Sequence, residues 1–165
     1  MRHIFIDCEW TLDQNIFLLS YAFKNGDSGV IYGSKLNKTF LNRLLRSVRY
    51  IYVYGPDIAY LEKNFALDFR ERFYCINMLR LVKKTLPGLK SYKLANIEKL
   101  FRIPRSTRKY KTSVFTIWRD WHDKKKREHV IRYNLEDARN LRQLYYILSD
   151  QYALTHRMIL DARLI

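Results

Sequence analysis

The chain has 165 residues, enough for a single domain that buries an apolar core without disulfide bonds. It carries 31 lysines and arginines against 16 acidic residues, which gives a formal net charge of +15. Such an excess favours a polyanionic partner, and nucleic acid is the first candidate. A membrane surface is disfavoured, because Arg2 replaces the glycine of a myristoylation signal and the C-terminal region has no cysteine for prenylation.

The apolar runs are too short to span a bilayer, and acidic residues begin at Asp7, where a secretory leader would still be apolar. Two cysteines, Cys8 and Cys75, lie in apolar runs, and their spacing matches no cysteine-rich zinc pattern. We expect them to be buried free thiols. These features predict a soluble cytoplasmic protein with no membrane partner, folded as one domain over residues 1–165.

The N-terminal half predicts a three-strand meander followed by mixed elements. The three strands, joined by polar turns, cover residues 3–9, 16–23 and 30–32. Helical spacing of apolar residues then indicates a helix over residues 37–48. A fourth strand over residues 50–54 ends at Gly55-Pro56, and the next helix begins at Asp57.

The C-terminal half predicts one more strand and several helices. The strand covers residues 73–76 and precedes a short helix that Pro87-Gly88 ends. Further helices are expected at 92–101, around Trp118 and Trp121, and at 130–152, and we expect the two tryptophans to pack in the core or in a groove wall. The whole pattern predicts an α/β fold in which helices cover a mixed sheet, with the antiparallel meander joined to parallel strands.

The first strand ends in two carboxylates, Asp7 and Glu9, which alternation places on the same side of the sheet. Like charges so close disfavour each other's ionised form. At the end of a core strand, a bound divalent cation commonly offsets this repulsion. The alternative is that the strand stops at Ile6 and that residues 7–13 form a solvated acidic loop.

Three further residues can join this pair. Asp57 follows the fourth strand directly, although a residue in this position is also a common helix N-cap. Tyr133 and Asp137 are spaced i, i+4 on the last helix and project from the same face. With Asp7 and Glu9, they supply four carboxylates and a phenol that one sheet could bring together.

A basic run follows Pro104, with four lysines or arginines among the seven residues 105–111. The run is either a solvated face or the lining of a groove that binds phosphates. The candidate nucleic-acid-binding residues are Trp10, Lys90, Lys93, Arg105, Arg108, Lys109 and Lys111.

Three segments, residues 7–9, 54–57 and 133–137, resemble in their order the motifs of the DEDDy 3′–5′ exonucleases of the ribonuclease H-like superfamily. Residues 78–104 resemble a branch of predicted exonucleases that often accompany helicases. The chain departs from the usual pattern at Trp10, where a small or hydroxyl residue is common, and at Asn77, where that branch often has an acid.

The resemblance implies a metal-dependent hydrolysis of phosphodiester bonds. Asp7 would bridge two Mg²⁺ or Mn²⁺ ions, with Glu9 and Asp137 completing one site. Asp57 would act through the water shell of the second ion, and Tyr133 would orient the attacking water and help to deprotonate it. The implied substrate is the single-stranded 3′ end of DNA or RNA, and the implied partner is a helicase or a repair or replication protein.

Two other interpretations remain open at this point. The chain could be a nucleic-acid-binding module of the same fold without turnover, or a structure-selective endonuclease of the same superfamily. Tyr133, four residues before Asp137, favours the exonuclease pattern over the endonuclease. Magnesium-dependent turnover and a circular substrate separate the three functions.

Overall fold

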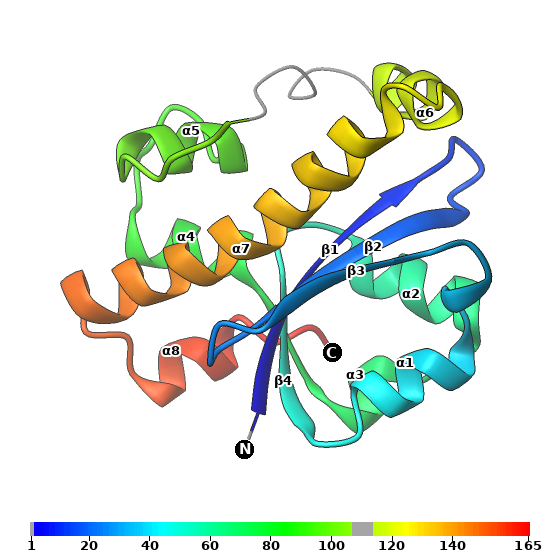
Figure 1. Cartoon of the computed structure of the whole chain (residues 1–165). Helices are drawn as coiled ribbons and strands as arrows, with labels where there is room; N and C mark the ends of the chain where they lie inside the picture. The colour runs from blue at the N-terminus through cyan, green and yellow to red at the C-terminus, as the bar shows by residue number, and fades with distance from the viewer. Residues whose placement is uncertain (1, 107–113) are drawn as a thin grey trace.

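The computed structural model describes residues 2–106 and 114–165. These residues form a five-stranded sheet in the order β3-β2-β1-β4-β5 (Figure 1). Neighbours pair antiparallel from β1 to β3, while β1 pairs parallel with β4 and β4 with β5. The strands are β1 (Arg2–Trp10), β2 (Ile16–Phe23), β3 (Ser28–Tyr32), β4 (Val48–Val53) and β5 (Tyr74–Asn77). The predicted meander and parallel extension are both confirmed.

The central strand β1 is buried on both faces, and its alternating side chains enter two different cores. Ile4, Ile6 and Cys8 belong to one core, and Phe5 belongs to the other. Both cysteines are buried and free, as expected.

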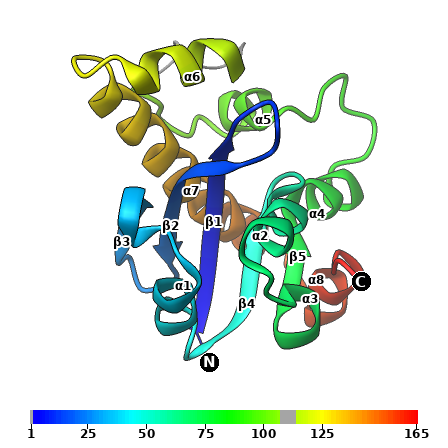
Figure 2. The ribbon, with the colours of Figure 1, turned by 90° about the vertical axis from the view of Figure 1, so that its right-hand side faces the viewer.

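Three helices cover the first face of the sheet, as Figure 2 shows. They are α1 (Lys38–Leu44), α2 (Asp57–Phe65) and α3 (Phe69–Arg72), and the 3-10 turn η1 (Gly33–Lys35) precedes them. Helix α1 is shorter than the predicted 37–48. The Asn37 side chain caps its start by accepting from the Phe40 N–H at 2.9 Å. It ends early because β4 already begins at Val48.

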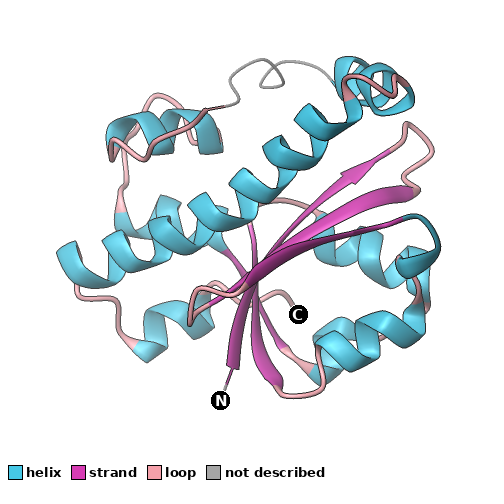
Figure 3. Cartoon of the chain, in the orientation of Figure 1, coloured by secondary structure: helices cyan, strands magenta, loops and turns pink. Residues whose placement is uncertain are grey.

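The second face is covered by α4 (Met78–Thr85), α5 (Leu94–Leu100), α7 (Arg127–Gln151) and α8 (His156–Asp161). Helix α7 has 25 residues and runs diagonally across the sheet (Figures 1 and 3). Its apolar stripe, including Leu141, Leu144 and Leu148, packs with Phe5 and Tyr52 of the sheet. The N-terminal half of α7 thereby lies over the end of β1 that carries Asp7 and Glu9.

Helix α6 (Val114–His122) and the start of α7 form a smaller core with β2, where Ile117 and Val130 pack with Leu18. The two tryptophans of α6 differ in their surroundings. Trp121 is half-buried and has its ring 5.0 Å from that of Phe17. Trp118 lies 5.1 Å from the same ring but keeps 37% of its surface exposed, so it is less buried than expected.

No sequence pattern predicted α3 or the C-terminal segment that contains α8. Helix α8 begins after Thr155, whose hydroxyl accepts from the Met158 N–H at 3.2 Å. Beyond it, Arg163 bridges to Ile76 of β5. Neither range of described residues contains a helix with the length and apolar character that crossing a bilayer requires.

Candidate metal and nucleic-acid site

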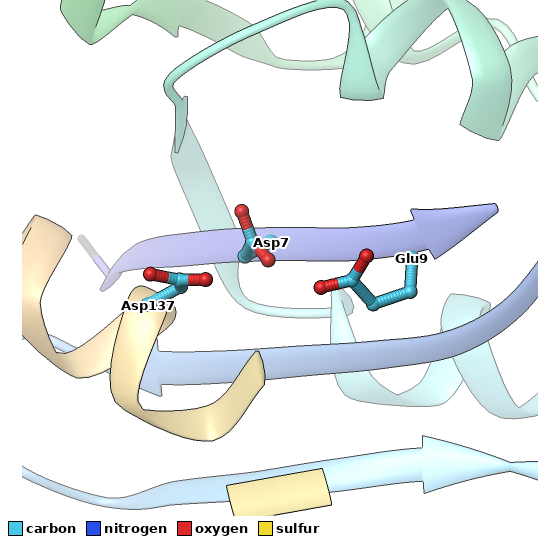
Figure 4. A group of neighbouring side chains, drawn as sticks. All are labelled: Asp7, Glu9 and Asp137. Carbon is cyan, nitrogen blue, oxygen red and sulfur yellow. The ribbon is translucent and has the colours of Figure 1, made fainter. Parts of the chain in front are cut away.

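Three carboxylates gather between β1 and α7. One oxygen each from Asp7, Glu9 and Asp137 lies within 4.8 Å of the others, and Figure 4 shows the three side chains together. Strand β1 continues to Trp10, with Asp7 paired opposite Ser20 of β2. The alternative of an acidic loop after Ile6 is therefore wrong, and strand alternation is what turns both β1 acids toward α7.

Asn134 fixes the position of one of these acids. Its side-chain amide donates to Asp7 Oδ2 at 2.6 Å, and its backbone carbonyl accepts from the Ser20 hydroxyl at 2.6 Å. Asn134 is fully buried. No motif in the sequence marks Asn134, although it lies three residues before Asp137 and so shares that face of α7.

Asp57 approaches the same region from the first turn of α2. It is 3% exposed, and its Oδ1 accepts from the Cys8 N–H at 3.1 Å. Pro56 occupies the N-cap position. The Asp57 carboxylate therefore connects α2 to β1 between the two acids of that strand, and it lies outside the compact group of three.

Tyr133 lies one turn before Asp137 on α7. Burial raises the pKa of Asp137, and the hydrogen bond that the Tyr133 hydroxyl donates to its carboxylate offsets part of that rise. Burial, followed by the negative charge of Asp137, raises the pKa of the Tyr133 phenol above its usual value. At neutral pH the phenol is therefore protonated and can act as a hydrogen-bond donor.

The acids themselves are poorly solvated and repel each other. Burial raises the pKa values of Asp7 and Glu9 well above their usual range, and the charge of Asp137 adds to both effects. Burial also raises the pKa of Asp57 to about 6 and that of Asp137 to about 6. A positive charge placed among these groups would stabilise their ionised forms.

One such charge is already present. The Arg105 guanidinium forms ion pairs with Asp137 and with Glu98, and the Arg105 side chain is 4% exposed. Although burial lowers the pKa of Arg105, its hydrogen bond to Glu98 and the charge of Asp137 raise it above its usual value. Its carbon Cζ also lies 5.2 Å from the Tyr133 ring centroid. Arg105 is thus buried beside the acids and is not part of a solvated basic face.

A cleft of about 670 Å³ brings most of the predicted site residues together. Lys90 and Lys93 are exposed on its wall, and Trp10 packs its ring 4.6 Å from that of Tyr60. The predicted residues that line the cleft are Asp7, Trp10, Asp57, Lys90, Lys93, Arg105, Tyr133 and Asp137. Glu9 belongs to the carboxylate group but does not line the cleft. Arg108, Lys109 and Lys111 lie outside the described residues.

The donor set fits a hard divalent cation. Mg²⁺ and Mn²⁺ prefer carboxylate oxygens, and three such oxygens from Asp7, Glu9 and Asp137 lie close enough to share one ion. The contact of Arg105 with Asp137 shows that a cation is already favoured at this carboxylate. Fold and site together define a ribonuclease H-like domain with an acidic cluster between its central strand and α7.

Comparison with known proteins supports this class. The RNase H superfamily model matches residues 4–149, and the chain belongs to that superfamily. No curated protein matches the chain in a sequence search.

Solved structures share the fold at low sequence identity. The family B DNA polymerase of the archaeon Pyrobaculum calidifontis has a TM-score of 0.72 and is 16% identical over 90% of this chain. The chain spans only 24% of that polymerase. NrnC of Brucella melitensis has a TM-score of 0.61 and 16% identity, covering 94% of this chain and 77% of NrnC. NrnC with bound Mg²⁺ gives a TM-score of 0.60 at 17% identity, with the same coverage.

Proposed function

We propose that this protein is a metal-dependent 3′–5′ exonuclease of the DEDDy type, which hydrolyses DNA or RNA. The observation that carries the proposal is the convergence of Asp7, Glu9 and Asp137 on one small volume, with Asp57 and Tyr133 beside it. These five residues come from β1, α2 and α7, elements far apart in the sequence. A nuclease that uses divalent cations requires such a set of convergent oxygen ligands.

The proposed chemistry divides the roles among the acids and the phenol. Bound divalent cations would lower the pKa of a water molecule and stabilise the leaving 3′ oxygen. Asp7, Glu9 and Asp137 would hold these cations directly, and Asp57 would act through their water shell. Because the Tyr133 phenol is protonated and donates to Asp137, its oxygen would orient the attacking water by accepting a hydrogen bond from it.

The cleft wall would hold the nucleic acid. Lys90 and Lys93 are exposed on one side, where their ammonium groups can contact backbone phosphates. Trp10 lies at the position where the family that the chain resembles usually has a small or hydroxyl residue, and its ring packs against Tyr60. We infer that this ring narrows the pocket for the terminal nucleotide.

Two structural neighbours support a metal-dependent activity on nucleic acid. One is a DNA polymerase, and another is a protein with bound Mg²⁺. Because their sequence identity to this chain is low, these structures show that the chain shares their fold and nothing further. Four points stay predictions: which of Mg²⁺ and Mn²⁺ is used, how many ions bind, whether a helicase or repair protein is a partner, and whether the protein is cytoplasmic.

A binding module without turnover is the second candidate, and one observation favours it. Asp137, a proposed ligand, is already neutralised by the buried Arg105 guanidinium. If this ion pair persists when cations are present, the site binds nucleic acid through its positive charge and leaves the phosphodiester intact.

The test is digestion of 5′-labelled single-stranded and duplex DNA and RNA in Mg²⁺, Mn²⁺ or EDTA, with Asp7→Ala as the control variant. A metal-dependent ladder that shortens from the 3′ end, absent in the variant, supports the exonuclease. A circular single strand should remain intact, whereas its cleavage would indicate an endonuclease. If both proteins bind nucleic acid tightly and in a salt-sensitive way but cleave none of it, the protein is a binding module and not an exonuclease.

A further inference from the structure

We propose that Arg105 is the residue that binds the scissile phosphate, and that Glu98 and Asn140 form the buried support that holds its guanidinium in place. This inference rests on the proposed function, because it assigns a substrate contact within the same cleft. It differs from a general role in nucleic-acid binding, since it places one guanidinium at the reacting phosphodiester.

The support of Arg105 is rigid and buried. Arg105 Nε donates to Glu98 Oε2 at 2.8 Å, and Arg105 Nη2 contacts Glu98 Oε1. The Asn140 side-chain amide donates to Glu98 Oε1 at 3.1 Å and to the Pro104 carbonyl at 3.3 Å. Glu98 is 1% exposed and Asn140 is 5% exposed. A planar guanidinium held at two of its nitrogens has little freedom left, so its third nitrogen is fixed in direction.

That third nitrogen lacks a protein partner. Arg105 Nη1 is buried, and no group among the described residues accepts a hydrogen bond from it. A buried charged donor left without an acceptor is destabilising, and native proteins seldom retain one unless a ligand or water completes it. Arg105 lines the cleft together with Asp7, Tyr133 and Asp137. An anionic ligand in the cleft would supply the missing acceptor.

The charges around the guanidinium identify that ligand as a phosphate. Arg105 pairs with both Glu98 and Asp137. Divalent cations bound at Asp137 would take over the neutralisation of that carboxylate and leave Arg105 and Glu98 as a neutral pair. A phosphodiester brings one further negative charge and two free oxygens, either of which can accept from Arg105 Nη1. Lys90 and Lys93 are exposed on the cleft wall, where contacts are looser and screened by salt. Arg105 is instead desolvated, which strengthens its interaction with a phosphate.

The test compares two trinucleotides, one with a natural phosphodiester at the 3′-terminal linkage and one with an uncharged methylphosphonate there. Binding is measured by calorimetry in Ca²⁺ for the wild type, Arg105→Lys and the double variant Glu98→Gln/Arg105→Met. The double variant leaves the net charge unchanged and removes both buried charges together. Lys90→Gln is the matched control for the loss of a cleft-wall charge. Thermal unfolding and Mn²⁺ titration check that fold and metal binding persist.

Wild type should bind the phosphodiester trinucleotide more tightly than the methylphosphonate trinucleotide. In the double variant the ratio of the two affinities should fall by about 10- to 100-fold, the effect of losing one charge-assisted hydrogen bond. Arg105→Lys should lose part of this preference, because lysine keeps the positive charge but lacks the Nη1 donor that the contacts with Glu98 hold in place. Lys90→Gln should weaken both trinucleotides equally. An unchanged preference in folded, Mn²⁺-binding variants would overturn the role of Arg105, as would a loss shared equally by both trinucleotides.

The two proposals can fail separately. If wild type cleaves nucleic acid while the double variant keeps its preference, the exonuclease stands and the assignment of Arg105 is wrong. If wild type cleaves nothing but the preference depends on Arg105, the phosphate site stands and the exonuclease is wrong.

Discussion

Replacing Asp57 with asparagine should stabilise the metal-free protein at neutral pH. The Asp57 carboxylate is 3% exposed, and burial raises its pKa from 3.8 to about 6. Asparagine keeps the oxygen that accepts from the Cys8 N–H at 3.1 Å and removes the charge. One pKa unit corresponds to about 1.36 kcal/mol, so the charged group destabilises the fold by up to about 3 kcal/mol.

The sign of the pH dependence follows from the direction of this pKa change. A carboxyl group whose pKa is raised on folding binds its proton more tightly in the folded state, so its stabilising effect is present in acid. That effect is lost as the pH rises from about 4 to about 6. The advantage of Asp57→Asn should therefore be largest above pH 6 and vanish below pH 4.

Urea unfolding in EDTA at pH 7.5 and at pH 4 measures this difference directly, and both proteins are also unfolded in saturating Mn²⁺. In Mn²⁺ the advantage of the variant should shrink, because a cation near Asp57 stabilises the ionised carboxylate that burial disfavours. A variant no more stable than wild type in EDTA at pH 7.5 would show that the buried Asp57 charge does not destabilise the fold. A gain of equal size at both pH values would show that the gain does not come from this charge.

Three further substitutions test other parts of the molecule. Asn134→Ala removes the amide that donates to Asp7 and should lower Mn²⁺ affinity by about 10- to 100-fold in calorimetry, whereas unchanged affinity would remove Asn134 from the site. Leu144→Ala should cost about 2–5 kcal/mol in urea unfolding, because Leu144 is fully buried between α7 and the sheet; a near-zero loss would contradict this packing. Burial lowers the pKa of His3 to about 4, so wild type should lose stability relative to His3→Phe as the pH falls from 6.5 to 4, and parallel pH profiles would argue against it.

The sheet could be predicted from the sequence because its strands carry strong local signals. Alternating apolar residues and polar turns define β1 to β3, and Gly55-Pro56 follows the end of β4. The same alternation predicted that Asp7 and Glu9 share one face of β1, as the pairing register shows. Helix α8 was missed because its main determinants are the Thr155 cap and contacts with distant elements.

The surroundings of Arg105 could not be predicted from local sequence. It begins a run rich in lysine and arginine, and such runs usually indicate solvated surface. Its burial depends on Glu98 and on Asp137, which lies 32 residues away. The hydrogen bond from Asn134 to Asp7 spans 127 residues, so composition and spacing carry no direct signal for it. Long-range polar contacts of this kind require the fold itself.

The central claim, metal-dependent release of nucleotides from a 3′ end, is tested most directly by analysis of the products. Wild type and Asp7→Asn are incubated with a single-stranded oligonucleotide in Mn²⁺ or EDTA, and the released species are identified by mass spectrometry. Wild type in Mn²⁺ should release nucleoside 5′-monophosphates, because water attack with a leaving 3′ oxygen keeps the phosphate on the 5′ position. None should be released in EDTA or by the variant. An intact oligonucleotide with wild type in Mn²⁺, or equal release by Asp7→Asn, would contradict the central claim.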